Sequence, residues 1–473
     1  MAESRTSILK RFGYLLSGHW VREVLQAVFL LSLARHATET YGQFMLAINI
    51  GQLLLFATEF GLNQHLATML ARKENLPTRI LGQVTMIKSV FLIIGWLIML
   101  GFIFWQGYSG QLRLIILIIA TAVALEGIGN SFYVACRVLG RQDVEGKTRG
   151  LASIIGFGWG IAAIFTGLGP VLVALFKSFE TFTSLFVVLR AFLGRVRHEL
   201  RFRDIRAVWM AWREGLVFTA MAVCAIFYNK LNLFFLHSNA GAEGVAQYSA
   251  TWQIVDGVSI LVSGMLLGKV LFPIFAKHWG NNRETFVKLA RQSAAWLMAA
   301  ALPVSYVLFV ESDRIIPLAY GQNFGPAILA QKQLVGCILF AFLHNLASYL
   351  MISMKRQRIL LLMYIAGLAF NLAACILLTR FTPLTNAAIA ILATKGLMAL
   401  MTVSFCQITL GLFTLSSLFK QILAAGAAAA IHFSLSPALP REAVELLALI
   451  PLLAYAYRLY LGQKRGPDTA GMA

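Results

Sequence analysis

The sequence has little charge and lacks the residue patterns of a soluble enzyme. Charged residues make up only 13% of the 473-residue chain, whereas 59% are hydrophobic and the mean hydropathy is +0.75. In ordinary soluble domains about a quarter of the residues are charged. The composition therefore excludes a water-soluble enzyme. A spanning helix needs about 20 apolar residues, so the length allows about fourteen spans and leaves no room for a separate catalytic domain.

The patterns of common catalytic and metal centres are also missing. The five cysteines lie in apolar runs without a CxxC pair, and the eight histidines form neither H-x-x-x-H nor H-E-x-x-H. No Walker A motif is present, which excludes an ATPase of that type. We interpret the cysteines as small core residues. We therefore expect a protein that is not an enzyme and that holds no metal or cofactor.

Hydropathy windows of about 19 residues predict an all-α polytopic membrane protein with about fourteen transmembrane helices. The first six lie at 13–34, 41–60, 82–106, 113–136, 149–168 and 170–193. The next six lie at 214–236, 245–275, 289–310, 325–353, 359–379 and 384–407. A last pair lies at 418–435 and 443–461.

A stretch with seven arginines from Arg190 to Arg213 is the longest polar connection, and it separates the two groups of six helices. We therefore predict two six-helix lobes and a C-terminal helix pair. The predicted parts are an N-terminal lobe at 1–194, a cytoplasmic basic connection at 195–213, a C-terminal lobe at 214–410, and the helix pair with the tail at 411–473.

The positive charge of the chain predicts its orientation. Lysine and arginine number 40 against 20 aspartates and glutamates, a net charge of +20 that in a membrane protein is typical of cytoplasmic loops. With a cytoplasmic N-terminus, most of these cations fall in inside loops, including Arg137, Arg141, Lys147 and Arg149. The outside loops hold only Arg35, Arg113, Arg314, Arg380 and Arg441. Both termini are therefore predicted to be cytoplasmic.

A weak internal repeat supports two homologous lobes. A shift of 204 residues places Glu39, Gln43 and Phe44 over Glu243, Gln247 and Tyr248. An even number of helices in each lobe puts such repeats in parallel topology, with a path for a transported molecule between them.

Charged side chains inside predicted spans are the strongest functional signal, because Arg or Lys at a helix centre costs roughly 2.5–3.5 kcal/mol on insertion scales. Lys88, Lys269 and Lys332 lie near helix ends, where a long side chain can reach the interface. The other cations are predicted to line a hydrated cavity, and they are Arg22, Lys177, Lys230 and Lys395.

Polar residues share helix faces with these cations and extend the predicted cavity wall. The first helix has a single stripe at i, i+3, i+4 and i+7, and the fourth has Glu126, Asn130 and Tyr133 on one face. The predicted wall residues are His19, Gln26, Asn49, Gln52, Tyr228, Asn229, Asn232 and Trp252. The acids that would pair with cations or bind a coupling ion are Glu23, Glu126 and Asp256.

Buried ion pairs are the alternative interpretation of the same charges. Lys177 lies three residues before Glu180, a spacing that favours a local pair. For Arg22 and Lys230 a pair and a cavity role both stay open. A cationic cavity with amides and aromatic rings suits an anionic headgroup that carries sugars, because Lys and Arg bind phosphate.

Two motifs near the ends of the second helix carry a resemblance to a known family. They are ARHATETYGQF at 34–44 and EFGL at 59–62. The sequence resembles the polysaccharide transporter family, the Wzx-type lipid-linked oligosaccharide flippases of the multidrug/oligosaccharidyl-lipid/polysaccharide exporter superfamily, over essentially its whole length. The Arg22-Glu23 pair is similar to a basic-acidic pair in the first helix of the lipid II branch.

This resemblance implies a MATE-like fold in the bacterial inner membrane and transport by alternating access. The implied cargo is an undecaprenyl-pyrophosphate oligosaccharide for O-antigen, capsule or exopolysaccharide, whose lipid tail stays in the bilayer. The implied partners are a polysaccharide polymerase and the chain-length machinery, and no nucleic acid.

Two other functions remain open at this point. A multidrug exporter coupled to H⁺ or Na⁺ is expected to have an acidic cavity, whereas the basic residues in the spans match or exceed the acids. A membrane-embedded glycan ligase or polymerase needs a base or nucleophile beside an accessible loop, and the predicted outside loops are short.

Overall fold

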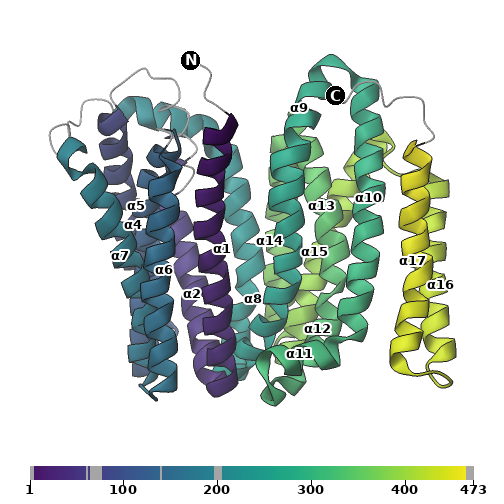
Figure 1. Cartoon of the computed structure of the whole chain (residues 1–473), viewed down its shortest axis with the longest axis horizontal. Helices are drawn as coiled ribbons and strands as arrows, with labels where there is room; N and C mark the ends of the chain where they lie inside the picture. Colours follow the sequence, from purple (N-terminus) through teal and green to yellow (C-terminus); the bar gives the residue numbers. More distant parts are fainter. Residues whose placement is uncertain are drawn as a thin grey trace. The chain divides into compact units, whose positions relative to one another are not determined.

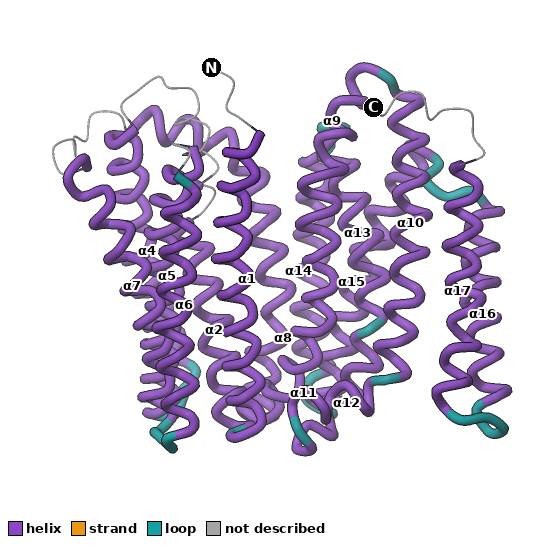
Figure 2. The backbone as a smooth tube through the Cα atoms, viewed as in Figure 1, coloured by secondary structure: helices purple, strands orange, loops and turns teal. Residues whose placement is uncertain are grey.

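The protein is built from helices in all the ranges that its structure describes (Figures 1 and 2). A computed structural model describes residues 5–59, 62, 63, 66, 77–138, 141–196 and 205–464. Within a bilayer core a helix satisfies its own backbone hydrogen bonds, so a chain of this composition has few alternatives. Part of the EFGL motif, the Lys269 side chain and the side chains of the arginine-rich connection lie outside the described residues.

The described ranges of the first half of the chain contain seven long helices. They are α1 (Arg5–His36), α2 (Thr38–Glu59), α4 (Pro77–Trp105), α5 (Gly110–Val138), α6 (Gln142–Phe165), α7 (Pro170–Val196) and α8 (Ile205–Ile260). All six spans predicted for the N-terminal lobe coincide with the first six of these helices. The largest shifts are at α1 and α6, which begin eight and seven residues before their predicted starts at 13 and 149.

The second half has more and shorter elements. After α8 come η1 (Leu261–Leu271), α9 (Phe272–Asn281), α10 (Arg283–Val310), α11 (Ser312–Tyr320) and η2 (Gln322–Phe324). These are followed by α12 (Gly325–Leu334), α13 (Gly336–Ser353), α14 (Gln357–Leu378), α15 (Pro383–Leu410), α16 (Leu415–Leu435) and α17 (Arg441–Lys464).

Two single spans predicted in this half are divided in the structure. The segment predicted at 245–275 changes from α-helix to the π-helix η1 at Leu261 and returns to α-helix at Phe272. Tyr349 of α13 lies against η1. A Cβ atom added to Gly268 of η1 would lie 2.8 Å from the Tyr349 hydroxyl oxygen. The segment predicted at 325–353 divides into α12 and α13 at Val335.

The number of candidate crossings is close to the prediction. Twelve helical segments in the described ranges are long and apolar enough to cross a membrane. One of them, Thr219–Asn281, has 63 residues. Two crossings of a bilayer core need only about 40 helical residues. Its backbone leaves helical geometry at Gly241 (φ 65°, ψ −165°), so it contains two crossings. The α1 helix is not among the twelve, but its 32 residues are long enough to cross a bilayer core.

The chain forms two compact units, residues 1–246 and 247–473, whose boundary lies in α8 just after Gly241. The first part of α8 therefore packs within the first unit. Its Phe234 ring lies 5.4 Å from Phe102, and its His237 ring lies 5.0 Å from Tyr108.

Aromatic rings and glycines hold the helices of the first unit together. Phe29, Phe44, Phe157 and Phe176, from α1, α2, α6 and α7, form one buried cluster, in which Phe29 and Phe176 are 4.3 Å apart. At Gly42 a Cβ atom would lie 1.8 Å from the Ala242 carbonyl oxygen. Only glycine lets the backbones of α2 and α8 approach so closely. This contact accounts for the glycine in the Tyr-Gly-Gln-Phe motif.

The second unit contains the C-terminal helix pair α16 and α17. A small core of Ala299, Ala424, Ala428, Leu452 and Tyr455 joins the pair to α10. Tyr306 of α10 also hydrogen-bonds His432 of α16, with 3.0 Å between Oη and Nδ1.

Ion pairs at the start of α17 complete this attachment. Arg441 donates to both carboxylate oxygens of Asp313, each at 2.6 Å, and to the Val310 carbonyl at 2.6 Å. It also contacts Glu311 at 3.2 Å and Glu445 at 2.7 Å. We call Arg441 with these three acids the outer clamp. The clamp ties the helix pair to the end of α10.

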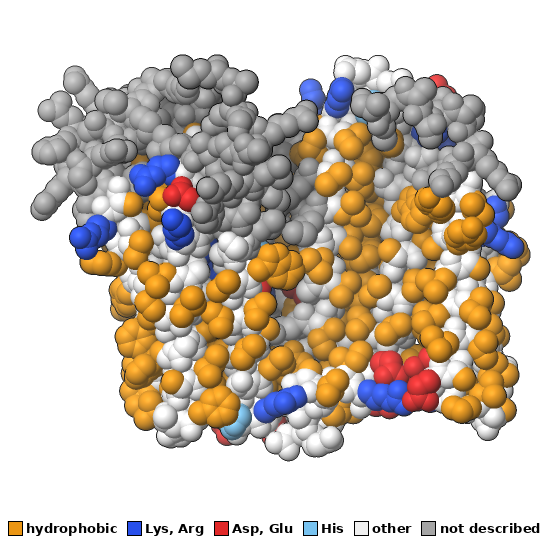
Figure 3. Space-filling view, viewed as in Figure 1, with side chains coloured by type: hydrophobic (Ala, Val, Ile, Leu, Met, Phe, Trp, Pro, Cys, Tyr) orange, Lys and Arg blue, Asp and Glu red, His pale blue; other side chains and the backbone are white. Residues whose placement is uncertain are grey.

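The surface is that of a multi-pass membrane protein. Large apolar side chains are exposed along the helices, among them Trp105, Phe186, Leu377 and Ile408. Figure 3 shows that such side chains cover much of the visible face, with most of the visible charges toward its two ends. A lipid-facing surface requires this distribution, because uncompensated polar groups are costly in the bilayer core.

Candidate functional site

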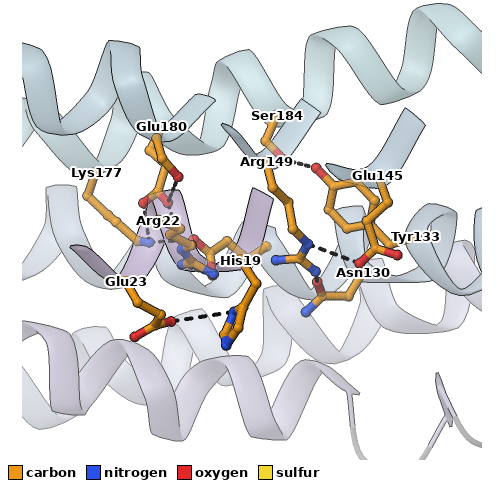
Figure 4. Close-up of polar contacts among 12 residues, drawn as sticks. His19, Arg22, Glu23, Asn130, Tyr133, Glu145, Arg149, Lys177, Glu180 and Ser184 are labelled. Atoms are coloured by element: carbon orange, nitrogen blue, oxygen red, sulfur yellow. Dashed lines mark hydrogen bonds and ion pairs between the residues drawn. The ribbon is translucent and has the colours of Figure 1, made fainter. Parts of the chain in front are cut away.

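Four buried charges from three helices form a closed set of ion pairs in the first unit. Arg22 of α1 contacts Glu126 of α5 at 3.2 Å and Glu180 of α7 at 2.9 Å. Lys177 of α7 contacts Glu180 at 2.6 Å and also donates to Glu126. Figure 4 shows Lys177 and Glu180 pointing toward Arg22. We call these four residues the charge ring. Each cation in it contacts both carboxylates.

The charge ring is buried to different depths. Lys177 and Glu180 are 6% and 4% exposed, whereas the side chains of Arg22 and Glu126 are 21% and 19% exposed. A Cβ on Gly156 of α6 would lie 2.6 Å from that of Glu180, so this glycine lets α6 and α7 close around the carboxylate. A buried charge without a partner is strongly unfavourable. The ring therefore compensates its own charges and also joins α1, α5 and α7.

A second group of charges lies at the facing ends of α5 and α6. Glu145 is 1% exposed and accepts two hydrogen bonds from Arg137, at 2.7 and 2.6 Å, and one from Arg149, at 3.0 Å. Arg149 also donates to Asn130 Oδ1 at 3.2 Å, and its guanidinium carbon lies 4.3 Å from the centre of the Tyr133 ring. We call Arg137, Glu145 and Arg149 the Glu145 cluster.

Further polar contacts continue from this cluster toward α2 and α4. Asn130 donates to Glu59 Oε1 at 2.7 Å. Lys88 donates to Asn63 Oδ1 at 2.6 Å and to the Gly127 carbonyl at 2.7 Å. The expectation that Lys88 reaches the interface is wrong, because its side chain is completely buried among these partners.

A pocket opens between the charge ring and the Glu145 cluster. Its wall includes Arg22, Glu126, Asn130, Tyr133, Arg149 and Thr181. Guanidinium groups, an amide and hydroxyls can bind phosphate oxygens or sugar hydroxyls, and Tyr133 adds an aromatic ring. In the described residues of the chain, no group of three or more histidines, cysteines or acids is placed to hold a metal ion.

The other predicted site residues of the first unit have different surroundings. His19 and Glu23 form an exposed pair 3.7 Å apart, while Gln26 is half-buried and Gln52 is exposed. Asn49 is buried and donates to the Met45 carbonyl at 2.6 Å.

The four predicted residues of α8 in this unit lie deeper. Tyr228 and Asn232 are buried, and Lys230 is half-buried. Asn229 donates to the Ala225 carbonyl at 2.8 Å.

The predicted residues of the second unit lie around Trp252. The Lys395 ammonium is 5.8 Å from the centre of the Trp252 ring, which stacks on Tyr248 at 6.0 Å. Lys395 is 8% exposed, and Asp256, one turn after Trp252 on the same helix, is half-buried. Lys395 and Trp252 were both predicted to line a cavity, and the fold brings them together.

Sequence analysis missed the position of Arg149. It was assigned to an inside loop, but α6 begins at Gln142 and carries Arg149 in its second turn, at the pocket. Two features of the sequence pointed in this direction. Glu145 lies one helical turn earlier, and Asn130 and Tyr133 were already predicted to share a face with Glu126. The Lys177–Glu180 pair suggested by the sequence spacing is present.

The sequence of residues 8–279, more than half of the chain, matches the family model for polysaccharide biosynthesis proteins. The chain belongs to this family. A search of curated proteins gives no significant match.

Solved structures of MOP-superfamily proteins share the fold of this family member. The lipid II flippase MurJ in an inward closed conformation has a TM-score of 0.72 at 13% identity, over 96% of this chain and 99% of that chain. An inward-facing multidrug resistance MATE family transporter has a TM-score of 0.65 at 15% identity, over 82% and 94%. The Vibrio cholerae MATE transporter VcmN has a TM-score of 0.55 at 16% identity, over 86% and 99%.

These comparisons confirm the expected fold and the expected family. The protein is an all-helical polytopic membrane protein with the architecture of MATE and MurJ transporters. At 13–16% identity the likeness concerns the fold, and the cargo has to be argued from the site.

Proposed function

We propose that this protein is a flippase that moves an undecaprenyl-pyrophosphate-linked oligosaccharide across the bacterial inner membrane by alternating access. The product would serve O-antigen, capsule or exopolysaccharide synthesis. The family is one of polysaccharide biosynthesis, and the fold is that of a flippase and of exporters. Together these point to the export step of such a pathway.

The observation that carries the proposal is the polar pocket of the first unit. It places two arginines, an amide, hydroxyls and an aromatic ring among spanning helices. Polar groups at such a depth are typical of a substrate pathway. Arginine binds phosphate oxygens strongly, and Asn130 and Tyr133 offer contacts to sugars. The polyprenyl tail would stay in the bilayer.

Other residues complete the proposed pathway. In the first unit Lys230 lies on a helix that also carries buried amides, and in the second unit Lys395 lies beside Trp252. Acids such as Glu23, Glu126 and Asp256 would pair with these cations or bind a coupling ion, H⁺ or Na⁺.

Both termini would be cytoplasmic, with a polymerase and chain-length machinery as partners on the outer side. The basic connection at 195–213 would lie on the cytoplasmic side.

Deletion of the gene in its host tests the proposal. We expect surface polysaccharide to be lost and undecaprenyl-pyrophosphate glycan to accumulate at the cytoplasmic face. Wild type should restore both pools. Arg22→Ala should not, although the variant is present in the membrane by immunoblot. Arg380→Ala, at an exposed arginine, is the matched control and should behave as wild type.

Two outcomes would contradict parts of this proposal. Normal pools after deletion, together with a greater sensitivity to cationic drugs, would favour a multidrug exporter instead. Full export by Arg22→Ala would remove Arg22 from the mechanism.

A further inference from the structure

The two cations and two carboxylates of the charge ring cancel, so the ring has no net positive charge for a ligand. Arg22 already contacts Glu126 and Glu180, and Lys177 contacts the same two carboxylates. An incoming phosphate would have to displace a carboxylate from Arg22 and leave that carboxylate with Lys177 alone. Such an exchange is unfavourable in a buried site. Arg22 is therefore poorly placed to make the first contact with an anion.

The Glu145 cluster, in contrast, has one positive charge more than it has negative charges. Arg137 donates to both oxygens of Glu145, at 2.7 and 2.6 Å. Arg149 shares one of those oxygens at a longer distance, 3.0 Å. Of the two arginines, only Arg149 lies in the pocket wall. The positive charge that remains for a ligand therefore belongs to Arg149.

The side chain of Arg149 is held in a defined position. Its Nε and Nη2 donate to Glu145 and Asn130, and its plane lies over Tyr133. The Tyr133 hydroxyl is itself hydrogen-bonded to Ser184 at 2.6 Å, which fixes the ring. Figure 4 shows this arrangement. The described hydrogen bonds of Arg149 use Nε and Nη2, and the side chain is 23% exposed. A guanidinium that is already held in position loses little entropy on binding.

A buried hydroxyl in the same wall lacks a hydrogen-bond partner among the described residues. Thr181 is 1% exposed and lines the pocket. Its Oγ1 is buried and, among the described residues, has no hydrogen bond. Buried hydroxyls nearly always have a partner, so a missing one indicates a ligand or an ordered water. Arg149 and Thr181 thus offer two donors at one pocket.

We propose that Arg149, with Thr181, makes the first contact with the pyrophosphate of the lipid-linked substrate, before Arg22 takes part. This assignment rests on the proposed function. Tyr133 and Asn130 act as positioning residues that hold the guanidinium. Arg149 belongs to the charges predicted to be cytoplasmic, so the contact would lie on the side from which the substrate enters.

Binding of geranyl pyrophosphate to the purified full-length protein in detergent tests the assignment. Arg149→Gln should weaken binding by roughly 10- to 100-fold, the loss expected for a charged hydrogen bond. Arg380→Gln is the matched control, because it removes an exposed arginine that does not line the pocket. It should change the affinity less than about twofold. Tyr133→Leu should weaken binding more than Tyr133→Phe does, because phenylalanine keeps the ring under Arg149 and loses only the hydrogen bond to Ser184.

Three outcomes would overturn the assignment. The first is an equal loss of affinity in Arg380→Gln and Arg149→Gln, which would mean that binding depends on the net charge of the protein and not on a contact in the pocket. The second is wild-type affinity in Arg149→Gln. The third is equal affinity of the wild type for inorganic and geranyl pyrophosphate, which would identify a site for a free anion. Export by the deletion strain separates the two proposals. If wild type and Arg149→Gln restore export equally well, the result supports the flippase function and contradicts only the role of Arg149.

Discussion

Arg22 of α1 and Glu126 of α5 are 104 positions apart in the sequence, and Arg22 Nη2 lies 3.2 Å from Glu126 Oε1. This contact joins the first helix to the middle of the first unit. Since Lys177 binds the same carboxylate, the position of α1 and the charge state of the pocket depend on the same few side chains.

A double-variant cycle measures the contribution of this contact. We expect Arg22→Gln to reduce the free energy of unfolding by about 1–3 kcal/mol, less than for a fully buried pair because both side chains are partly exposed. Glu126→Gln should also destabilise the protein. The double variant should lose less than the two single changes added together. Thermal unfolding in detergent provides the measurement, and strictly additive losses would show that the two residues are not coupled.

Gly42 is expected to tolerate no side chain. A Cβ atom there would lie 1.8 Å from the Ala242 carbonyl oxygen, so α2 and α8 would have to separate. Gly42→Ala should destabilise the protein by about 1–3 kcal/mol, as overpacking does. Gly101→Ala is the control, because a Cβ at Gly101 has no atom within 4 Å and alanine favours the helix. Equal melting temperatures for the two variants would contradict the close approach.

Lys88 and Lys332 looked alike in the sequence, but their environments differ. Lys88 is fully buried between Asn63 and the Gly127 carbonyl, whereas Lys332 is half-buried, with its ammonium 5.8 Å from the Phe309 ring. Lys88→Met leaves two buried acceptors without a donor and should cost about 1–3 kcal/mol. Lys332→Met should change stability by less than about 0.5 kcal/mol. Chemical denaturation of the two variants compares them directly, and similar midpoints would argue against a buried Lys88.

Acidification is expected to loosen the outer clamp. Hydrogen bonds from Arg441 hold the pKa of the Asp313 carboxyl below its usual value of 3.8. A lowered pKa in the folded protein means stabilisation that is present above pH 3.8 and is lost as pH falls through the folded value. Because the pair is largely exposed, the expected contribution is only about 0.2–1 kcal/mol. Asp313→Asn should lower stability at pH 7 and should abolish the loss below pH 4.

Glu311 of the same clamp is expected to respond in the opposite direction. Burial and the neighbouring Glu445 raise the pKa of the Glu311 carboxyl above 4.5, even though Arg441 and Arg314 are also near. Its contribution is therefore present below pH 4.5 and is lost as pH rises through the folded value. Glu311→Gln should not destabilise the helix pair at pH 7. Hydrogen exchange of α16 and α17 across a pH series checks both variants, and the same pH profile for both would contradict the assignment.

The positions of most spanning helices could be predicted from the sequence because spanning depends on the length of an apolar run, which is a local property. All six predicted spans of the first half coincide with helices, and the last pair was placed at α16 and α17. The π-helix at Leu261–Leu271 and the division at Val335 were not predicted. Both leave the hydrophobicity of the segment unchanged, so hydropathy does not report them.

The partners of the buried charges could be predicted only where they lie on one helix. The pair between Lys177 and Glu180 follows from their spacing. The contacts of Arg22 with Glu126 and Glu180 cannot be predicted from sequence spacing, because they depend on the rotation and depth of three helices. Packing sets both quantities, through contacts such as Gly156 with Glu180 and Gly42 with Ala242.

The sequence by itself determined that this protein crosses a membrane many times, that it consists mainly of long apolar helices and that its buried cations matter. These conclusions follow from hydrophobic length and from the cost of charge in a bilayer. Only the tertiary structure decided which cations are compensated. Arg22 and Lys177 share two carboxylates, whereas Arg149, which the sequence assigned to a loop, lies in the pocket wall. Charge compensation depends on distances of a few ångströms between helices, and those distances are set by packing.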